Sequence, residues 1–168
     1  MWNRKPTPAA SIALGGVLSA LAVVIMGLGG MLSVATYVCP VAAMLLLKVV
    51  LMVCGEKMAW AFYGAVSILS LLICPDKEAA AVFLFLGFYP ILKPRLDQSR
   101  FPWHMKAVFF NGDILLLYWL LLHLMGMNAL QQEFAEMGTA LILTLLLLGN
   151  LVFFMLDFIL GRRVQKRK

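Results

Sequence analysis

The chain has 168 residues, of which 63% are hydrophobic and 13% are charged, and its formal net charge at pH 7 is +6. An ordinary soluble domain carries about 25% charged residues, so a water-soluble core of this size would leave much of the apolar surface uncovered. Composition therefore excludes a soluble globular domain and indicates a protein whose solvent is lipid. The basic charge alone does not indicate a nucleic-acid partner.

Six apolar segments follow one another along the chain. Alternation with a period of two is absent and Leu, Ala and Met dominate, so helices are predicted rather than strands. A helix needs about 20 residues to cross the hydrocarbon core of a membrane. We therefore predict an all-α integral membrane protein, a single domain over 1–168 built as a six-transmembrane-helix bundle. The predicted spans are residues 11–32, 37–53, 58–74, 79–92, 107–127 and 138–160.

Small residues recur at helical spacing in and just before the first span, at Ala9, Ala13, Gly16 and Ala20. In lipid, helices associate by close packing, and small side chains let their backbones approach. Two interpretations are open. The small residues contact other helices of the same chain, or they form a docking face for a partner subunit.

The fourth span, 79–92, is short, because its 14 residues cover only about 21 Å as a helix. Pro90 lacks a backbone donor, and Pro94 disfavours helix at Lys93. The fourth helix is therefore predicted to end or kink close to Tyr89. A basic segment follows it and lies on the membrane surface, where anionic lipid would attract it.

Positive residues set the orientation of such a protein. Six crossings bring both termini and the basic 93–106 segment to one side, together with every Lys and Arg except Lys48 and Lys77. A five-span arrangement without 79–92 would separate that segment from the basic C-terminal tail. We predict a multi-pass plasma-membrane protein with both termini in the cytoplasm.

Three ionisable residues, Lys48, Asp113 and Asp157, fall within the predicted spans. An unpaired charge in the middle of a bilayer costs at least about 2.5–3.5 kcal/mol. All three lie in the cytoplasmic half at similar depths, so we hypothesise an ion pair between Lys48 and Asp113. Asp157 has two alternative partners, Lys48 and Arg162.

Amide side chains extend this group. Asn150 shares a helix face with Asp157, and Asn111 adjoins Asp113. Together these residues predict a polar seam between the second, fifth and sixth spans. The seam serves either as a latch that fixes the order of the helices or as a path for protons or ions.

The external loops carry few polar groups. Tyr37, His123, Asn128 and Gln131 are the candidates to line a small ligand pocket open to the outside. Motifs for nucleotide binding, zinc hydrolysis or nucleophilic catalysis are absent, so an enzyme is not expected. No cofactor, metal or nucleic acid is predicted, and membrane lipid is the expected partner.

The whole chain resembles the substrate-binding membrane subunits, or S components, of energy-coupling factor transporters. The similarity lies in the six spans, the inward termini, one short helix and the small-residue face of the first helix. The stretch PDKEAAAVFLFLGFYPILKPRLD is also similar to uncharacterised bacterial membrane proteins of that kind. The resemblance implies that a vitamin-like small molecule binds near the outer side. It also implies that Ala13 and Gly16 meet a transmembrane coupling protein driven by ATPase subunits.

Two other functions fit the same architecture. One is a non-transporting membrane scaffold or assembly protein, comparable with the cell-shape protein MreD. The other is an ion- or proton-coupled carrier that uses Lys48, Asp113 and Asp157. A transporter subunit requires an enclosed outer cavity, a scaffold would be packed solid there, and a carrier needs an aqueous route to Asp113.

Overall fold

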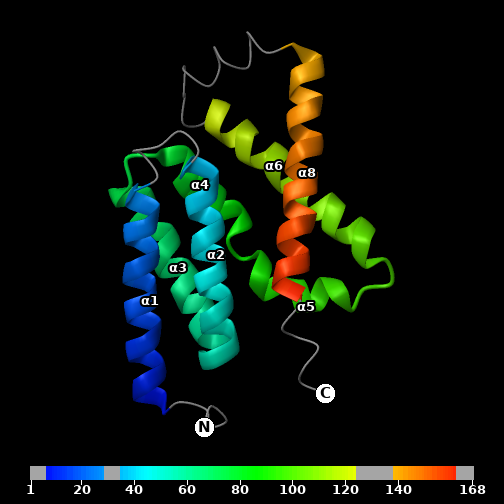
Figure 1. The fold of residues 1–168 in the computed structure, drawn as a ribbon. Helices are drawn as coiled ribbons and strands as arrows, with labels where there is room; N and C mark the ends of the chain where they lie inside the picture. The colour runs from blue at the N-terminus through cyan, green and yellow to red at the C-terminus, as the bar shows by residue number, and fades with distance from the viewer. Residues whose placement is uncertain (1–6, 29–34, 124–137, 162–168) are drawn as a thin grey trace. The chain divides into compact units, whose positions relative to one another are not determined.

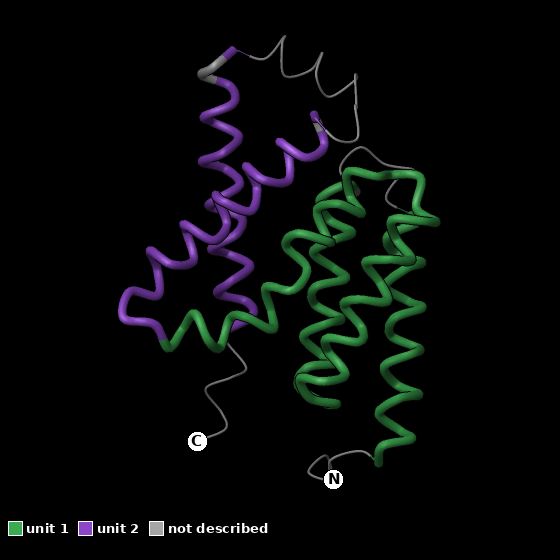
Figure 2. The backbone as a smooth tube through the Cα atoms, turned by 180° about the vertical axis from the view of Figure 1, so that it is seen from behind, with its two compact units in different colours: residues 1–98 green, residues 99–168 purple. Residues whose placement is uncertain are grey.

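The computed structural model describes residues 7–28, 35–123 and 138–161, and every regular element in these ranges is an α-helix (Figure 1). The all-α prediction is confirmed. The chain divides into two compact units, Met1–Gln98 and Ser99–Lys168, which are described separately below (Figure 2). The prediction of a single domain stays a prediction.

The first unit is a bundle in which α1, α2 and α3 pack on one another, while α4 packs on α2 and α3. The short α5 contacts α2 and α3. Figure 1 shows the first three helices side by side, joined at alternate ends. The helices are α1 (Pro8–Leu28), α2 (Ala35–Cys54), α3 (Glu56–Ile73), α4 (Lys77–Leu86) and α5 (Tyr89–Asp97).

A single residue, Gly55, separates α2 from α3. Its backbone has φ 93° and ψ 177°, a region that only glycine adopts without strain because a Cβ would clash with the backbone. The chain therefore reverses between two apolar helices without a loop, which brings α2 and α3 into direct contact. Gly55 is the one residue with a positive φ in the described part of the chain.

The face of α1 that packs against the rest of the unit carries Gly15, Ala22 and Met26, all of them buried. A Cβ added at Gly15 would lie 2.7 Å from Cε of Met58 on α3. The absence of a side chain at Gly15 thus leaves room for the end of the Met58 side chain between α1 and α3.

The helix of the fourth span is interrupted close to Tyr89, as Pro90 predicted, but a second helix continues the span. Helix α4 ends at Leu86, two residues form a turn, and α5 begins at Tyr89. Pro90 cannot donate to the carbonyl of Leu86, and its position in the first turn of α5 needs no donor.

The expectation that Pro94 prevents helix at Lys93 is wrong, as is the predicted end of this span at residue 92. Pro94 lies inside α5, and Lys93 is helical. The spacing of the two prolines explains this. In a helix, the backbone N–H of residue 94 would donate to the carbonyl oxygen of Pro90, in the first turn of α5. Because Pro94 has no N–H, α5 loses this one hydrogen bond but continues as a helix. Taken together, Lys77–Asp97 make a stretch of 21 residues that is apolar enough to cross a membrane.

The second unit contains α6 (Pro102–His123) and α8 (Thr139–Gly161), which contact each other. Helix α8 matches the predicted sixth span. Helix α6 begins five residues before the predicted fifth span, 107–127, whose end lies outside the described residues.

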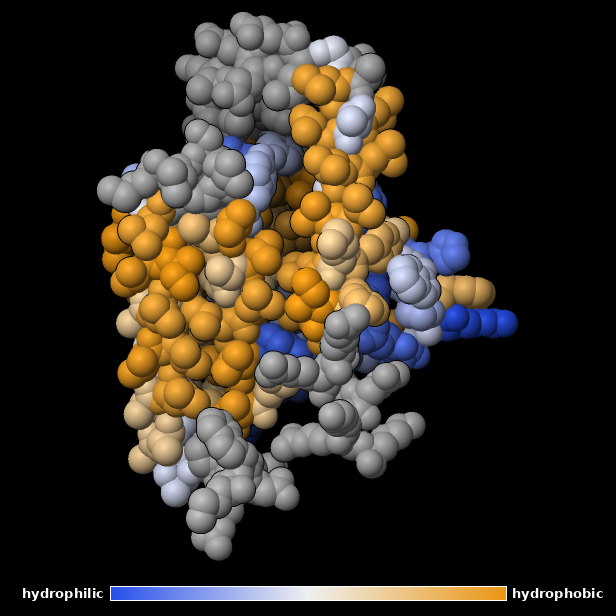
Figure 3. Space-filling model, viewed as in Figure 1, coloured by the Kyte–Doolittle hydropathy of each residue, from blue (hydrophilic) through white to orange (hydrophobic). Residues whose placement is uncertain are grey.

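Five helical stretches in the described residues are long and apolar enough to cross a membrane. Their outward side chains are apolar, as Leu72 on α3 (73% exposed) and Leu147 on α8 (72% exposed) illustrate, and Figure 3 shows such surface over α1, α2 and α8. These are the helices of a multi-pass membrane protein. The predicted number of six spans and the orientation of the termini stay predictions. The five are Pro8–Leu28, Thr36–Cys54, Glu56–Ile73, Lys77–Asp97 and Leu141–Gly161.

Candidate functional site

The small-residue stripe of α1, which we define as Ala9, Ala13, Gly16 and Ala20, is exposed along its whole length. A Cβ added at Gly16 would meet no atom within 4 Å. The stripe lies on a different face of α1 from the buried residues that contact α2 and α3. Within its own unit, therefore, packing against neighbouring helices does not account for the stripe.

Larger exposed side chains border the stripe on both sides. Ile12 is 65% exposed, Val17 is 67% exposed and Val24 is 59% exposed. At 3.6 residues per turn, Ile12 flanks the stripe on one side and the two valines flank it on the other. The result is a shallow apolar strip into which the side chains of another helix would fit.

At the other end of the first unit, two hydrogen bonds join the start of α2 to the start of α4. Thr36 Oγ1 donates to Asp76 Oδ2 at 2.7 Å, and Asp76 also accepts from the backbone N–H of Ala79 as the N-cap of α4. Tyr37 Oη donates to Glu78 Oε1 at 2.9 Å. The hydroxyl of Tyr37, a predicted ligand group, thus already ties two helices together.

The other predicted pocket residues lie apart from this cluster in the chain. His123 closes α6 in the second unit, where its Nδ1 is 3.0 Å from the carbonyl oxygen of Trp119 and its ring stacks on the Trp119 indole. Asn128 and Gln131 lie outside the described residues. The external ligand pocket stays a prediction.

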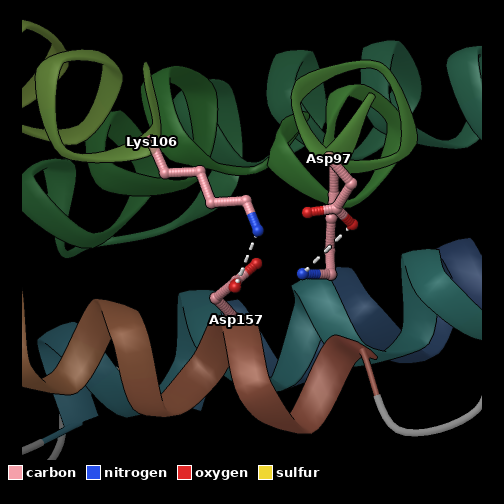
Figure 4. A network of polar contacts seen from close by, with 4 residues as sticks. Asp97, Lys106 and Asp157 are labelled. Carbon is pink, nitrogen blue, oxygen red and sulfur yellow. Dashed lines mark hydrogen bonds and ion pairs between the residues drawn. The ribbon is translucent and has the colours of Figure 1, made fainter. Parts of the chain in front are cut away.

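The second unit holds a polar seam between α6 and α8. Lys106 Nζ lies 2.9 Å from Asp157 Oδ2, and the two side chains are only 8% and 11% exposed (Figure 4). Lys106 was not considered as a partner of Asp157 from the sequence, because it had been placed in the surface loop. Of the two partners considered, Arg162 lies outside the described residues, and the pairing with Lys48 stays a prediction. Since α6 begins at Pro102, Lys106 lies in its second turn and faces α8.

One step further along the two helices, Asn111 and Asn150 exchange hydrogen bonds. Asn111 Nδ2 donates to Asn150 Oδ1 at 3.0 Å, and Asn150 Nδ2 donates to Asn111 Oδ1 at 2.9 Å. Each amide also donates to the carbonyl oxygen four residues earlier on its own helix. Stacked rings of Phe110 and Phe153, 4.6 Å apart, separate this amide pair from the ion pair. Asn111 and Asn150, two members of the predicted seam, thus pair between α6 and α8, whereas the seam of three spans stays a prediction.

The part of the seam that involves the second span is not decided by these contacts. Lys48 lies on α2 in the first unit and is buried, whereas Asp113 lies on α6 in the second unit. The hypothesised pair between Lys48 and Asp113 stays a prediction. Asp113 Oδ2 is buried without a hydrogen-bond partner among the described residues.

Comparison with known proteins adds no family to these observations. No protein-family model, curated protein or solved structure matches the chain. Within the described ranges, no group of three or more His, Cys, Asp or Glu side chains is placed to hold a metal ion.

Proposed function

We propose that this chain is the membrane-embedded substrate-binding subunit of a small-molecule uptake transporter and that it docks to a coupling subunit through α1. The observation that carries the proposal is the exposure of the small-residue stripe. Helices in lipid gain stability from close packing rather than from burial of apolar surface, so small residues mark helix contacts. On α1 the contacts inside the unit use another face, and in this proposal the stripe meets a helix of a second protein.

The resemblance to the S components of energy-coupling factor transporters supports the same arrangement, since their first helix meets the coupling protein. In this proposal the termini are cytoplasmic, the membrane is the plasma membrane, and the chain itself catalyses no reaction. A vitamin-like molecule binds near the outer end. The proposed ligand groups are Tyr37, His123, Asn128 and Gln131.

Purification of the tagged chain from its native membrane, followed by mass spectrometry, tests both parts of the proposal. The expected result is recovery of a transmembrane coupling protein with its ATPase subunits, together with a bound small molecule. Recovery of a non-ATPase assembly partner without a small molecule would instead support the scaffold interpretation.

Substitutions on α1 test the docking face. Ala13→Leu combined with Gly16→Leu fills the strip, and recovery of the coupling protein should fall by about tenfold or more, which corresponds to roughly 1.4 kcal/mol. Leu21→Phe is the matched control, because Leu21 is 46% exposed on the same helix but lies outside the stripe. Equal recovery with the double variant and the control would contradict docking through the stripe.

An ion- or proton-coupled carrier is the second candidate function, and Asp113 is the observation that favours it. Asp113 Oδ2 is buried and has no hydrogen-bond partner among the described residues. Such a carboxyl group within a membrane protein is a candidate to bind a proton or cation. In a carrier, Asp113→Asn would abolish ion-coupled uptake. In an ATPase-driven subunit, the same variant would keep uptake that depends on ATP.

A further inference from the structure

A pocket of about 450 Å³ lies at the start of α6, in the second unit. This volume is within the range of about 300–1,000 Å³ that is usual for small-molecule sites. Its walls combine one arginine, one histidine and two large apolar side chains. The lining residues are Ser99, Arg100, Phe101, His104 and Met105.

The cation in this pocket differs from its neighbours in the basic 93–106 segment. Lys93 is 3.6 Å from Asp97, Arg95 is 2.9 Å from Glu56, and Lys106 is 2.9 Å from Asp157. These three positive charges are each held by a carboxylate of the chain. The exceptional residue is Arg100, which forms no ion pair with any carboxylate in the described ranges.

Aromatic contacts hold the Arg100 guanidinium and the His104 ring at this position. The Arg100 guanidinium carbon lies 5.8 Å from the centroid of the Phe101 ring. The same ring meets the His104 imidazole edge-to-face at 6.1 Å. The guanidinium is thus supported on an aromatic face while its N–H donors stay available to an anion.

The apolar surroundings indicate where that anion comes from. Phe101 is 60% exposed, Met105 is 48% exposed, and the neighbouring Trp103 is 68% exposed. A soluble anion would make no favourable contact with such an apolar surface. Aromatic residues beside arginine are instead typical of the membrane–water interface, where headgroup phosphates and the first acyl carbons lie.

We propose that the pocket at the start of α6 binds the headgroup phosphate of one anionic phospholipid. Arg100 donates to the phosphate oxygens, His104 lies beside them, and Phe101 and Met105 contact the upper part of the acyl chains. This inference is independent of the transport function proposed above, because it concerns a different unit and a different ligand.

Native mass spectrometry of the full chain in detergent tests the site, with phosphatidylglycerol and phosphatidylcholine of the same acyl chains as probes. We expect discrete binding of one phosphatidylglycerol, and a loss of affinity of about tenfold in Arg100→Gln, or roughly 1.4 kcal/mol, since a charge-assisted hydrogen bond is lost. Arg100→Lys should retain part of the binding, because the charge stays while the planar group is lost.

Arg95→Gln is the matched control. It removes one positive charge from the same segment, but that charge is already paired with Glu56, so phosphatidylglycerol binding should be unchanged. Equal loss in Arg95→Gln and Arg100→Gln would overturn the site in favour of diffuse attraction. Equal binding of the two lipids would overturn it as well, and so would displacement of the lipid by excess inorganic phosphate, which would identify a soluble anion as the ligand.

Discussion

Lys106 and Asp157, 51 positions apart in the chain, form an ion pair with 2.9 Å between Nζ and Oδ2. The pair joins the first turns of α6 to the last turns of α8. Both side chains are largely buried. Each neutralises the charge of the other, which would destabilise the protein if it were left unpaired in an apolar environment.

Removal of one partner of this pair should be more harmful than removal of both. Lys106→Leu or Asp157→Leu alone leaves an uncompensated charge and should destabilise the protein by about 3–5 kcal/mol. The double variant should recover most of that loss. The midpoint of thermal unfolding in detergent, read out by size-exclusion chromatography, measures the effect. A double variant that is no more stable than the less stable single variant would show that the two side chains are not coupled.

The two amides of the seam should also be coupled, but more weakly. In a double-mutant cycle with Asn111→Leu and Asn150→Leu, we expect an interaction free energy of about 0.6–1.7 kcal/mol, the range known for hydrogen bonds between membrane helices. Each amide keeps its bond to a backbone carbonyl when its partner is lost, which limits the penalty. A coupling close to zero would mean that the backbone bonds alone satisfy the amides.

Gly55 should tolerate no side chain. Gly55→Ala forces a Cβ into a backbone region that is essentially limited to glycine and should lower the free energy of unfolding by about 1–3 kcal/mol. Gly64→Ala is the control, because Gly64 lies within α3 and a Cβ there meets nothing within 4 Å. The midpoint of thermal unfolding in detergent should fall for Gly55→Ala only. An equal fall for both variants would contradict the conclusion that the backbone conformation of Gly55 requires glycine.

Orientation can be tested by cysteine labelling in intact cells and in inverted vesicles. The three native cysteines are free and would first be replaced by alanine. Cysteines introduced at Gln98 and Lys168 should react with an impermeant maleimide only from the cytoplasmic side, whereas Gly138→Cys should react only from outside. Labelling of positions 98 and 168 on opposite faces would refute six crossings.

Much of the architecture could be predicted from local sequence because it follows from solubility and backbone chemistry. Apolar length predicts membrane helices, and Pro90 predicts the break beside Tyr89, since a missing N–H acts on the residue four positions earlier. Local sequence also places Asn111 and Asn150 in one seam, because Asn111 adjoins Asp113 and Asn150 shares a helix face with Asp157.

Only the tertiary structure decided which side chains meet. Asp157 pairs with Lys106, which the apolar pattern had assigned to a loop, because hydropathy does not show that α6 begins at Pro102, before the apolar run. The sequence also does not show which face of α1 packs inside the unit, since Gly15 and Gly16 are chemically identical and adjacent. In the structure Gly15 is buried beside Met58, whereas Gly16 is exposed. Composition and period therefore determine that this chain forms membrane helices, whereas the order and rotation of those helices arise from contacts between residues distant in sequence.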